Sequence, residues 1–371
     1  MQRDERMEAA RAPIERVVVS AYTIPTDAPE ADGTLSWDST TLILAELHCG
    51  GKSALGYTYG NHAIAVLVRH LAEKCLLRKQ TLDIPGLHAS MLREVRNDGN
   101  TGIGAMAISA LDIALWDLKA KLLGCSVMDL LGAAATSVAA YGSGGFTSYS
   151  DKQLAVQLSG WVQDGIRSVK MKIGTEPGRD PERVRAARNA IGVDAALFVD
   201  ANGAYTAKQA IALAERFGES GVTWFEEPVS SDHLDDLRRV RDAVPAGMDV
   251  AAGEYGYSPF YFRRMLSSQS VDVLQLDATR CRGFTGFLAG AAVAASFGCP
   301  LSAHCAPSLH MHVACAVPGF RNVEYFHDHV RIEKMLFDGF IPARHGQLEP
   351  DRSRPGLGLI FKHKDAERFA V

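Results

Sequence analysis

Short apolar runs alternate with longer amphipathic stretches from residue 138 onward. The apolar runs cover residues 138–145, 168–174, 196–203, 222–229, 249–256, 271–277, 300–305 and 322–326. The stretches between them place apolar residues at helical spacing and cover residues 151–164, 180–191, 207–217, 231–244, 258–267, 285–297 and 310–316. Strands that alternate with helices form parallel sheets, and eight such units close into a ring. The pattern therefore predicts an α/β protein with a (β/α)₈-type TIM barrel.

The first part of the chain groups its strands before its helices. The predicted strands are 14–22 and 40–48, with a polar loop at 26–37 between them and a tight turn at Gly50-Gly51 after them. The predicted helices are 63–77, 90–95 and 102–123, the last ended by Gly124. This order predicts an N-terminal α+β domain over residues 1–135. The barrel would then occupy 136–345, and a tail rich in Pro and Gly, 346–371, would run back to the first domain.

Composition narrows the class of protein. The chain has 371 residues, 47% of them hydrophobic, and a formal net charge of -4. These values fit a globular protein without the basic surface that binds nucleic acid, and no apolar run is long enough to cross a membrane. Residues 1–11 are charged and lack the apolar core of a secretory signal, so we expect a short frayed tail there. Seven scattered Cys without a CxxC pair favour reduced thiols and a cytoplasmic location.

Titratable residues recur at or near the ends of the predicted barrel strands. They are Lys172, Asp200, Glu226, Glu254, Asp277, His304 and Glu324, spaced 20 to 28 residues apart. One βα unit has about that length, so all seven should face the mouth formed by the carboxyl ends of the strands. Active sites of TIM barrels lie at that mouth.

Three successive members of this ring are carboxylates: Asp200, Glu226 and Glu254. Alone, each would be a helix cap or an ion-pair partner, but three that converge would repel one another unless a cation lies between them. Oxygen donors favour Mg²⁺, Mn²⁺ or Ca²⁺ over Zn²⁺. We therefore predict a divalent metal site.

The other members are acid–base candidates. Lys170 and Lys172 lie two apart on one strand and share a face, so each should lower the pKa of the other and make a neutral amine available as a base. Asp277 beside His304 should raise the imidazole pKa and hold its tautomer, giving a second acid–base group across the cavity. Glu324 could donate a hydrogen bond to a substrate carboxylate if it is protonated.

Other features carry less weight. His310 and His312 fall on a predicted helix, where i and i+2 do not share a face, and are interpreted as wall residues together with His327 and His329. The GSGG run at 142–145 fits close packing of the first barrel strand better than a phosphate loop. Cys305 is interpreted as a small core residue rather than a nucleophile.

A set of motifs resembles the enolase superfamily, specifically the mandelate racemase subgroup. They are Lys170-Met171-Lys172, Asp200-Ala201-Asn202, Glu226-Glu227-Pro228, Gly253-Glu254, Asp277 and His304, together with the Pro-Gly-Leu-Gly of the tail. The resemblance implies a modified (β/α)₇β barrel with an N-terminal α+β capping domain completed by the C-terminal tail. It also implies Mg²⁺-dependent removal of the proton α to a carboxylate, through a metal-stabilised enediolate.

The resemblance also implies roles for single residues. Asp200, Glu226 and Glu254 would hold Mg²⁺, or Mn²⁺ in its place. Lys172 would be one base, and His304 with Asp277 the other. Lys170, Asn202, Glu324 and Arg280 would contact the substrate. Three departures narrow the subgroup: Asp277 stands where the muconate-cycloisomerase type has Lys, Asn202 where the galactonate-dehydratase type has His, and Glu254 where the glucarate-dehydratase type has Asn.

The predicted function is that of an Mg²⁺-dependent lyase, an acid-sugar dehydratase that forms a 2-keto-3-deoxy acid. The alternative with the same two bases is a racemase or epimerase of a 2-hydroxy acid. A barrel hydrolase with a metal-activated water and a catalytically silent barrel stay open as alternatives of other classes. Polar residues of the first domain, such as Asp27, Glu30, Asp32, Tyr59 and Asn61, favour a hydroxylated ligand. The expected partners are a small-molecule carboxylate and further copies of the chain in a homo-oligomer, with no nucleic acid or membrane.

Overall fold

The computed structural model describes residues 12–371. Its centre is a closed ring of eight parallel strands in chain order, in which the last strand pairs with the first. The strands are β4 (Val138–Gly144), β5 (Ser168–Lys172), β6 (Ala196–Asp200), β7 (Val222–Glu226), β8 (Asp249–Ala252), β9 (Val273–Leu276), β10 (Leu301–Ala303) and β11 (Asn322–Phe326). All eight predicted barrel strands are confirmed, and so is the TIM-barrel fold class.

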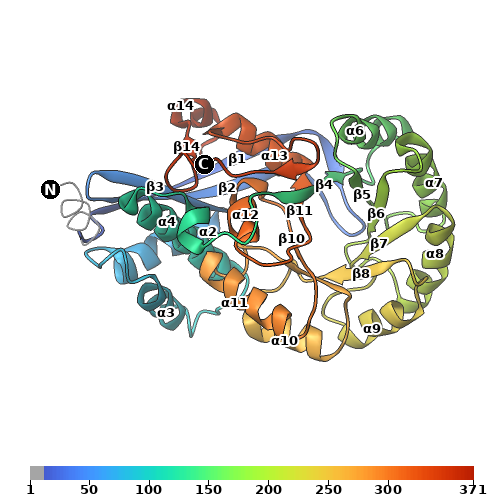
Figure 1. Cartoon of the computed structure of the whole chain (residues 1–371), viewed down its shortest axis with the longest axis horizontal. Coiled ribbons are helices and arrows are strands. Elements are labelled where there is room, and N and C mark those ends of the chain that lie inside the picture. Colours follow the sequence, from blue (N-terminus) through green and yellow to red (C-terminus); the bar gives the residue numbers. More distant parts are fainter. Residues whose placement is uncertain (1–11) are drawn as a thin grey trace.

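Helices surround this ring, and α6 to α9 form the outer rim at the right of Figure 1. The barrel helices are α6 (Asp151–Gln163), α7 (Asp180–Ile191), α8 (Ala207–Glu219), α9 (Leu234–Ala243), α10 (Pro259–Ser267), α11 (Gly283–Ser296), α12 (Pro307–Cys315) and α13 (His327–Leu336). Their starts have physical causes. Ser150 and Thr206 each form a capping box with the Gln three residues later, which satisfies free backbone N–H groups of α6 and α8.

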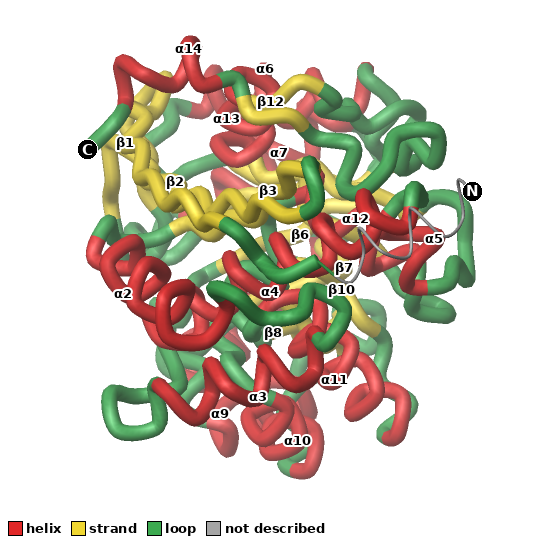
Figure 2. The backbone as a smooth tube through the Cα atoms, turned by 90° about the vertical axis from the view of Figure 1, so that its left-hand side faces the viewer, coloured by secondary structure: helices red, strands yellow, loops and turns green. Residues whose placement is uncertain are grey.

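The N-terminal domain is a three-stranded antiparallel sheet followed by helices. Its elements are β1 (Arg16–Ala31), β2 (Ser36–Cys49), β3 (Lys52–Tyr59), α2 (Ala63–Leu71), the π-helix η1 (Ala72–Leu76), α3 (Ile84–Glu94), α4 (Ile103–Leu123) and α5 (Val127–Leu131). In Figure 2 the three strands form one yellow sheet beside helix α2. The Gly50-Gly51 turn has positive φ at both residues, and Gly124 ends α4 in the left-handed conformation, as predicted.

The predicted loop at 26–37 is wrong. Strand β1 continues to Ala31 and pairs with β2, with a shift in register between Pro25 and Glu30. Pro25 and Pro29 are tolerated because β1 is the edge strand of its sheet, where a missing backbone N–H interrupts no ladder on the outer side. The result is a long hairpin whose tip reaches the barrel mouth.

Two predicted helices also have different bounds. The stretch 63–77 is split, because α2 ends at Leu71 and widens into the π-helix η1. Helix α3 begins at Ile84 rather than near residue 90, with a Pro in its first turn, where proline lacks only an N–H that has no partner within the helix.

Hydrogen bonds fasten the hairpin and α4 to the barrel. Thr147 N donates to Ala31 O (2.8 Å), and Thr175 Oγ1 donates to Asp32 O (2.8 Å), which holds the hairpin tip on the loops after β4 and β5. On the other side Asp112 of α4 accepts from both the N–H and the hydroxyl of Thr285 in α11. The N-terminal domain is therefore held over the mouth of the barrel.

The C-terminal tail contains β13 (Gln347–Leu348), β14 (Ile360–Phe361), α14 (His363–Ala366) and the 3₁₀ turn η2 (Glu367–Phe369). Strand β14 pairs with β12 (Phe337–Asp338), while Leu357 N donates to Asp117 of α4 and Val371 N donates to Ala21 of β1. The tail thus contacts the N-terminal domain. The exact boundaries at 135 and 345 stay predictions, and the frayed tail predicted at 1–11 lies outside the described residues. Across residues 12–371 no helix has the length and apolar character needed to cross a membrane.

Candidate active site

The ends of the barrel strands bring the predicted ring together. Lys172, Asp200 and Glu226 are the last residues of β5, β6 and β7. Asp277 and His304 directly follow β9 and β10, Glu254 lies two residues after β8, and Glu324 lies within β11. Every one of these seven side chains is buried, so their charges interact with little screening by water.

The period of two along each strand explains why these side chains point inward. Phe198 lies two residues before Asp200, and Trp224 lies two before Glu226, so each pair shares a face. The two rings stack with centroids 5.0 Å apart inside the barrel and pack with Tyr141, Ala251 and Val273. Trp224 Nε1 also donates to Glu226 Oε2 (2.9 Å). An aromatic layer therefore forms the floor on which the carboxylates rest.

The three predicted metal ligands form one cluster. Asp200, Glu226 and Glu254 each place a carboxylate oxygen within 4.8 Å of the others. Glu254 Oε2 is buried and accepts no hydrogen bond from the residues described. Three hard oxygen donors, one of them without a hydrogen bond, fit a hard divalent cation such as Mg²⁺.

Both lysines of β5 donate to this cluster. Lys170 contacts Glu226, lies 3.1 Å from Asp200 Oδ2 and 2.8 Å from Glu324 Oε1, and is fully buried. Lys172 Nζ lies 2.6 Å from Asp200 Oδ2. Only Lys172 of the two lines the cavity described below.

Lys170 lowers the pKa of Lys172, as predicted, but the net shift of both lysine pKa values in this arrangement is upward. Burial lowers the pKa of Lys172, and Lys170 lowers it further, but the carboxylates of Asp200, Glu254 and Glu324 together leave the pKa above its ordinary value. The pKa of Lys170 is likewise raised, because Glu226 and Glu324 outweigh the effect of burial. Carboxylates at hydrogen-bond distance act more strongly than a second ammonium on the same strand.

On the opposite side of the cavity, the carboxylate of Asp277 holds the His304 imidazole. Its Nδ1 lies 2.8 Å from Asp277 Oδ2, and its Nε2 lies 3.3 Å from Glu254 Oε2. Burial lowers the pKa of His304, but Glu254 and the hydrogen bond to Asp277 raise it, and the net direction is upward, as predicted. Thr279 donates to Asp277 Oδ1 through its N–H and its hydroxyl, both at 2.7 Å, which orients that carboxylate toward the imidazole.

Glu324 is an ionised acceptor rather than a protonated donor, which corrects the prediction. It accepts from Ser143 Oγ (2.6 Å), from Lys170 Nζ (2.8 Å) and from the backbone N–H of Cys305 (2.9 Å). Burial alone would raise the pKa of Glu324, but Lys170 and His304 hold it well below its ordinary value. Three donors directed at one carboxylate stabilise the charged form.

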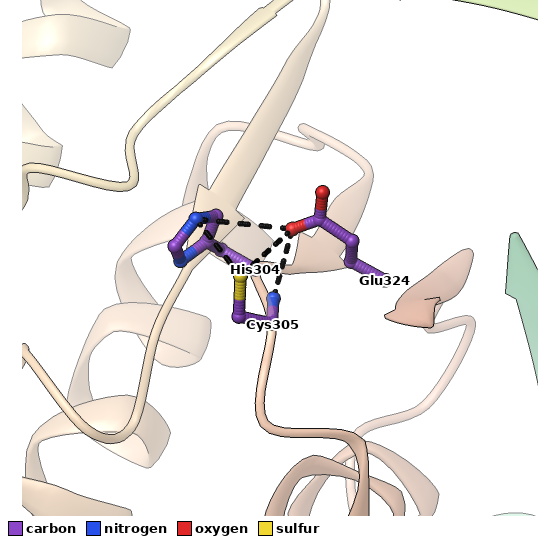
Figure 3. A group of neighbouring side chains, drawn as sticks. All are labelled: His304, Cys305 and Glu324. Carbon is purple, nitrogen blue, oxygen red and sulfur yellow. Dashed lines mark hydrogen bonds and ion pairs between the residues drawn. The ribbon is translucent and has the colours of Figure 1, made fainter. Parts of the chain in front are cut away.

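Cys305 is buried in a small apolar cluster with Phe146 and Phe326, as predicted, and it also lines the active-site cavity. Figure 3 shows its thiol, the His304 imidazole and a Glu324 carboxylate oxygen directed toward one another. The sulfur is 3.2 Å from His304 Nε2 and 3.4 Å from Glu324 Oε2. Cys305 and Ala306 both have positive φ, so the chain turns sharply after β10 without a glycine. The only sequence signal for this placement was its position next to His304.

Arg280 and Asn202 follow β9 and β6 and line the same cavity. Arg280 Nη1 donates to Glu254 Oε1 and to its backbone oxygen, both at 3.2 Å. Asn202 has positive φ, and its Oδ1 is buried without a hydrogen bond from any described residue. That oxygen is a free acceptor beside the carboxylate cluster.

The cavity has a volume of about 440 Å³ and lies between barrel and N-terminal domain. Lys172, Glu254, Asp277, His304 and Glu324 line its barrel side. From the N-terminal domain come Asp32, Leu35, Trp37, Tyr59 and Asn61, and the wall also includes Tyr255, Thr279, Cys305, Phe326 and His329. Leu35, Trp37, Tyr255 and Phe326 were not anticipated, because nothing in their local sequence indicates that they reach a mouth formed by distant strands.

Comparisons with known proteins agree with this geometry. The model of the mandelate racemase / muconate lactonizing enzyme N-terminal domain matches residues 35–132, and the enolase C-terminal domain-like model matches residues 153–366. The chain belongs to this family of the enolase superfamily. The members named below include dehydratases and cycloisomerases, so an enzymatic role follows at the level of the family.

Three similar proteins illustrate the range of sequence identity to this chain. A mandelate racemase/muconate lactonizing enzyme-like protein from Rubrobacter xylanophilus is 49% identical, with a TM-score of 0.94 over 97% of this chain and 100% of its own. The D-galactarolactone cycloisomerase of Agrobacterium fabrum is 33% identical over 70% of this chain and 69% of its own length. An L-talarate dehydratase from Polaromonas sp. JS666, solved with Mg and L-glucarate, is 29% identical, with a TM-score of 0.88 over 97% of this chain and 98% of its own.

Proposed function

We propose that this protein removes the proton α to the carboxylate of an acid sugar and then eliminates water from the β-carbon, forming a 2-keto-3-deoxy acid. One observation carries the proposal. Lys172 and the His304–Asp277 pair line a single cavity together with Glu254, which forms the buried carboxylate cluster with Asp200 and Glu226.

In this proposal Asp200, Glu226 and Glu254 hold Mg²⁺, with Mn²⁺ as a substitute. The L-talarate dehydratase relative solved with Mg supports this choice of metal, and so do the three oxygen donors. When bound, the ion supplies positive charge that stabilises the negative oxygens of the substrate as they develop.

Lys172 acts as the base. The Lys172 ammonium first gives a proton to solvent; the neutral amine then accepts the α-proton, and the electron pair of the C–H bond moves into the carboxylate to form an enediolate. Lys170 stays within its carboxylate partners and positions Glu226 and Glu324. Asn202 Oδ1 and Arg280 contact the substrate, since both face the cavity.

His304 acts as the acid in the second half. As an imidazolium oriented by Asp277, it gives a proton to the β-hydroxyl, which leaves as water while the enediolate electrons form a carbon–carbon double bond. The resulting enol then takes a proton at C3 to become the 2-keto-3-deoxy acid. Each general acid–base step contributes about 10²–10⁴-fold to the rate.

The test is a panel of acid sugars incubated with Mg²⁺ in D₂O, with products identified by NMR. A 2-keto-3-deoxy acid supports dehydration. The second candidate is an epimerase, favoured by the presence of two acid–base groups in one cavity and by relatives named as cycloisomerases. A stereoisomer that keeps every hydroxyl and carries deuterium at the α-carbon would establish the epimerase instead. The predicted homo-oligomer is tested separately by light scattering.

A further inference from the structure

A second group of potential metal ligands lies where the tip of the N-terminal hairpin meets the barrel. Asp27 and Glu30 of β1 and His327, the first residue of α13, each place a donor atom within 4.8 Å of the others. His327 Nε2 is 3.1 and 3.0 Å from the two carboxylate oxygens of Asp27. Donors bound to one Zn²⁺ at about 2.0–2.2 Å lie roughly 3.0–3.6 Å from each other. The Asp27–His327 spacing is close to this range, whereas Glu30 lies more than 4.0 Å from the His327 nitrogen and would move toward a shared ion.

Two buried carboxylate oxygens at this junction accept no hydrogen bond from any residue in the described range 12–371. Glu30 is 1% exposed, and its Oε2 accepts from Trp37 Nε1 (2.8 Å), while its Oε1 is buried without a hydrogen bond. Asp328 is fully buried, and its Oδ2 has no hydrogen bond either. An unpaired buried carboxylate oxygen is costly unless a cation or a proton satisfies it.

The charges at the junction do not balance. Three carboxylates, those of Asp27, Glu30 and Asp328, share one permanent cation, Arg331, which lies 2.5 Å from Asp328 Oδ1. Within residues 12–371, no Lys, Arg or His nitrogen comes within the 4.0 Å of an ion pair from the Glu30 carboxylate. Burial and the neighbouring Asp328 and Asp27 carboxylates raise the pKa of Glu30 to about 8, so the ionised form of Glu30 is unfavourable unless a cation lies beside it.

The backbone at this junction is already fixed. Arg331 Nη2 donates to Pro25 O (2.6 Å), Ser148 Oγ donates to Pro29 O (2.6 Å), and Thr147 N donates to Ala31 O (2.8 Å). The segment that carries Asp27 and Glu30 is thus held on both sides, while the carboxylates themselves stay under-satisfied. This is the arrangement of a preorganised ligand site.

We propose that Asp27, Glu30 and His327 form a second divalent-cation site, which takes Zn²⁺ and joins the hairpin of the N-terminal domain to the barrel. An imidazole with carboxylates favours Zn²⁺, whereas the oxygen-only cluster at the strand ends favours Mg²⁺. Asp27, whose side chain is 47% exposed, provides the entry path. Because Trp37 is both a wall of the active-site cavity and the donor to Glu30, the bound ion fixes that wall.

Calorimetric titration with Zn²⁺ tests the site without any activity assay. The Asp200→Asn/Glu226→Gln variant removes the oxygen-only cluster, and in it we expect one equivalent of Zn²⁺ to bind. Loss of a supporting residue around a metal already weakens binding 10- to 100-fold, so His327→Asn should raise the Kd at least about 100-fold. His233→Asn, at an exposed position on the barrel exterior, is the matched control and should leave Kd unchanged.

Thermal unfolding gives an independent signature. Without metal, Glu30→Gln should raise Tm because it removes an unpaired buried charge, and it should abolish the rise in Tm that Zn²⁺ produces in the parent. If the double variant folds poorly, the wild type replaces it in the titration. His327→Asn should then bind one equivalent of Zn²⁺ fewer than the wild type.

Binding of Zn²⁺ that survives His327→Asn overturns the proposal. So does the absence of any Zn²⁺ effect combined with a lower Tm for Glu30→Gln, since that pair of results means that Glu30 and Asp328 share a proton instead. These readouts do not depend on the proposed reaction, and failure of the dehydratase assay leaves them unaffected.

Discussion

The two walls of the active-site cavity hold their proton-transfer groups in different ways. On the β5 wall, the ammonium groups of Lys170 and Lys172 donate directly to the carboxylates of the metal cluster. On the wall formed by β9 and β10, the imidazole of His304 rests on Asp277, a carboxylate outside that cluster. Both walls are therefore coupled to the metal site, the histidine wall through Glu254, but only the histidine wall also has a carboxylate partner outside that site.

This difference explains why the two pKa shifts have different controls. The pKa of Lys172 depends chiefly on burial and on Asp200, a proposed metal ligand, so a bound cation would change it. The pKa of His304 depends on burial, on Glu254 and on Asp277, and Thr279 keeps Asp277 in place whatever the cluster binds. A bound cation would therefore change the pKa of Lys172 through Asp200 and that of His304 through Glu254, while the hydrogen bond to Asp277 stays in place.

Removal of the metal should stop proton transfer at both walls of the cavity. We expect it to have the largest effect on turnover. We expect Glu226→Gln, or chelation of the wild type, to reduce turnover by at least about 10³-fold, because several kcal/mol of charge stabilisation are lost. Steady-state assays with and without added Mg²⁺ measure this, and Mg²⁺ should restore only the chelated wild type. Glu215→Gln, at an exposed position on α8, is the control. Full activity after exhaustive chelation would contradict the metal assignment.

Single substitutions should distinguish the proton exchange at the lysine wall from that at the histidine wall. Lys172→Met should abolish exchange of the α-proton with D₂O for one substrate configuration, and His304→Asn should abolish it for the other, each by about 10²–10⁴-fold. NMR of both configurations measures the exchange. Lys208→Met and His233→Asn, both exposed, are matched controls. A metal-dependent hydrolase would keep its activity in Lys172→Met, so that result would overturn the two-base assignment.

Asp277→Asn should slow the exchange of the α-proton only at the histidine wall, on the order of 10- to 10²-fold. The pKa of His304 is raised above its reference of 6.5, so exchange that needs the neutral imidazole should increase with pH through a higher pKa than that of a free histidine. Removing the Asp277 charge takes away one raising influence, and the profile of exchange against pH should shift to lower pH. An unmoved profile for the histidine face would contradict the assigned pairing.

Cys305→Ala should have the smallest effect. The thiol contact with His304 Nε2 at 3.2 Å is lost, but the backbone N–H of Cys305 still donates to Glu324. A single hydrogen bond corresponds to about 1 kcal/mol, so exchange on the histidine face should change by about three- to tenfold. Cys299→Ala, outside the cavity, is the control. An effect as large as that of His304→Asn would mean that the thiol itself takes part in proton transfer.

Local pattern was sufficient for the barrel and for the ring at its mouth. The period of two places Lys170 and Lys172 on one face of β5 and places Asp200 and Glu226 above Phe198 and Trp224. The length of one βα unit then brings successive strand ends to the same height. These relations lie within one strand or one repeat, so the order of residues along the chain contains them.

Pairings across long separations were decided only by the tertiary structure. The lysines turned out to be ion-paired because carboxylates of β6, β7 and β11 surround them, and Glu324 is ionised because Lys170 and His304 lie beside it. Asp27 meets His327 across 300 residues, and Trp37 reaches the cavity only because β1 and β2 form a hairpin longer than its prolines suggested. The pKa of a buried group and the wall of a cavity depend on neighbours in space, and periodicity along the chain does not specify those neighbours.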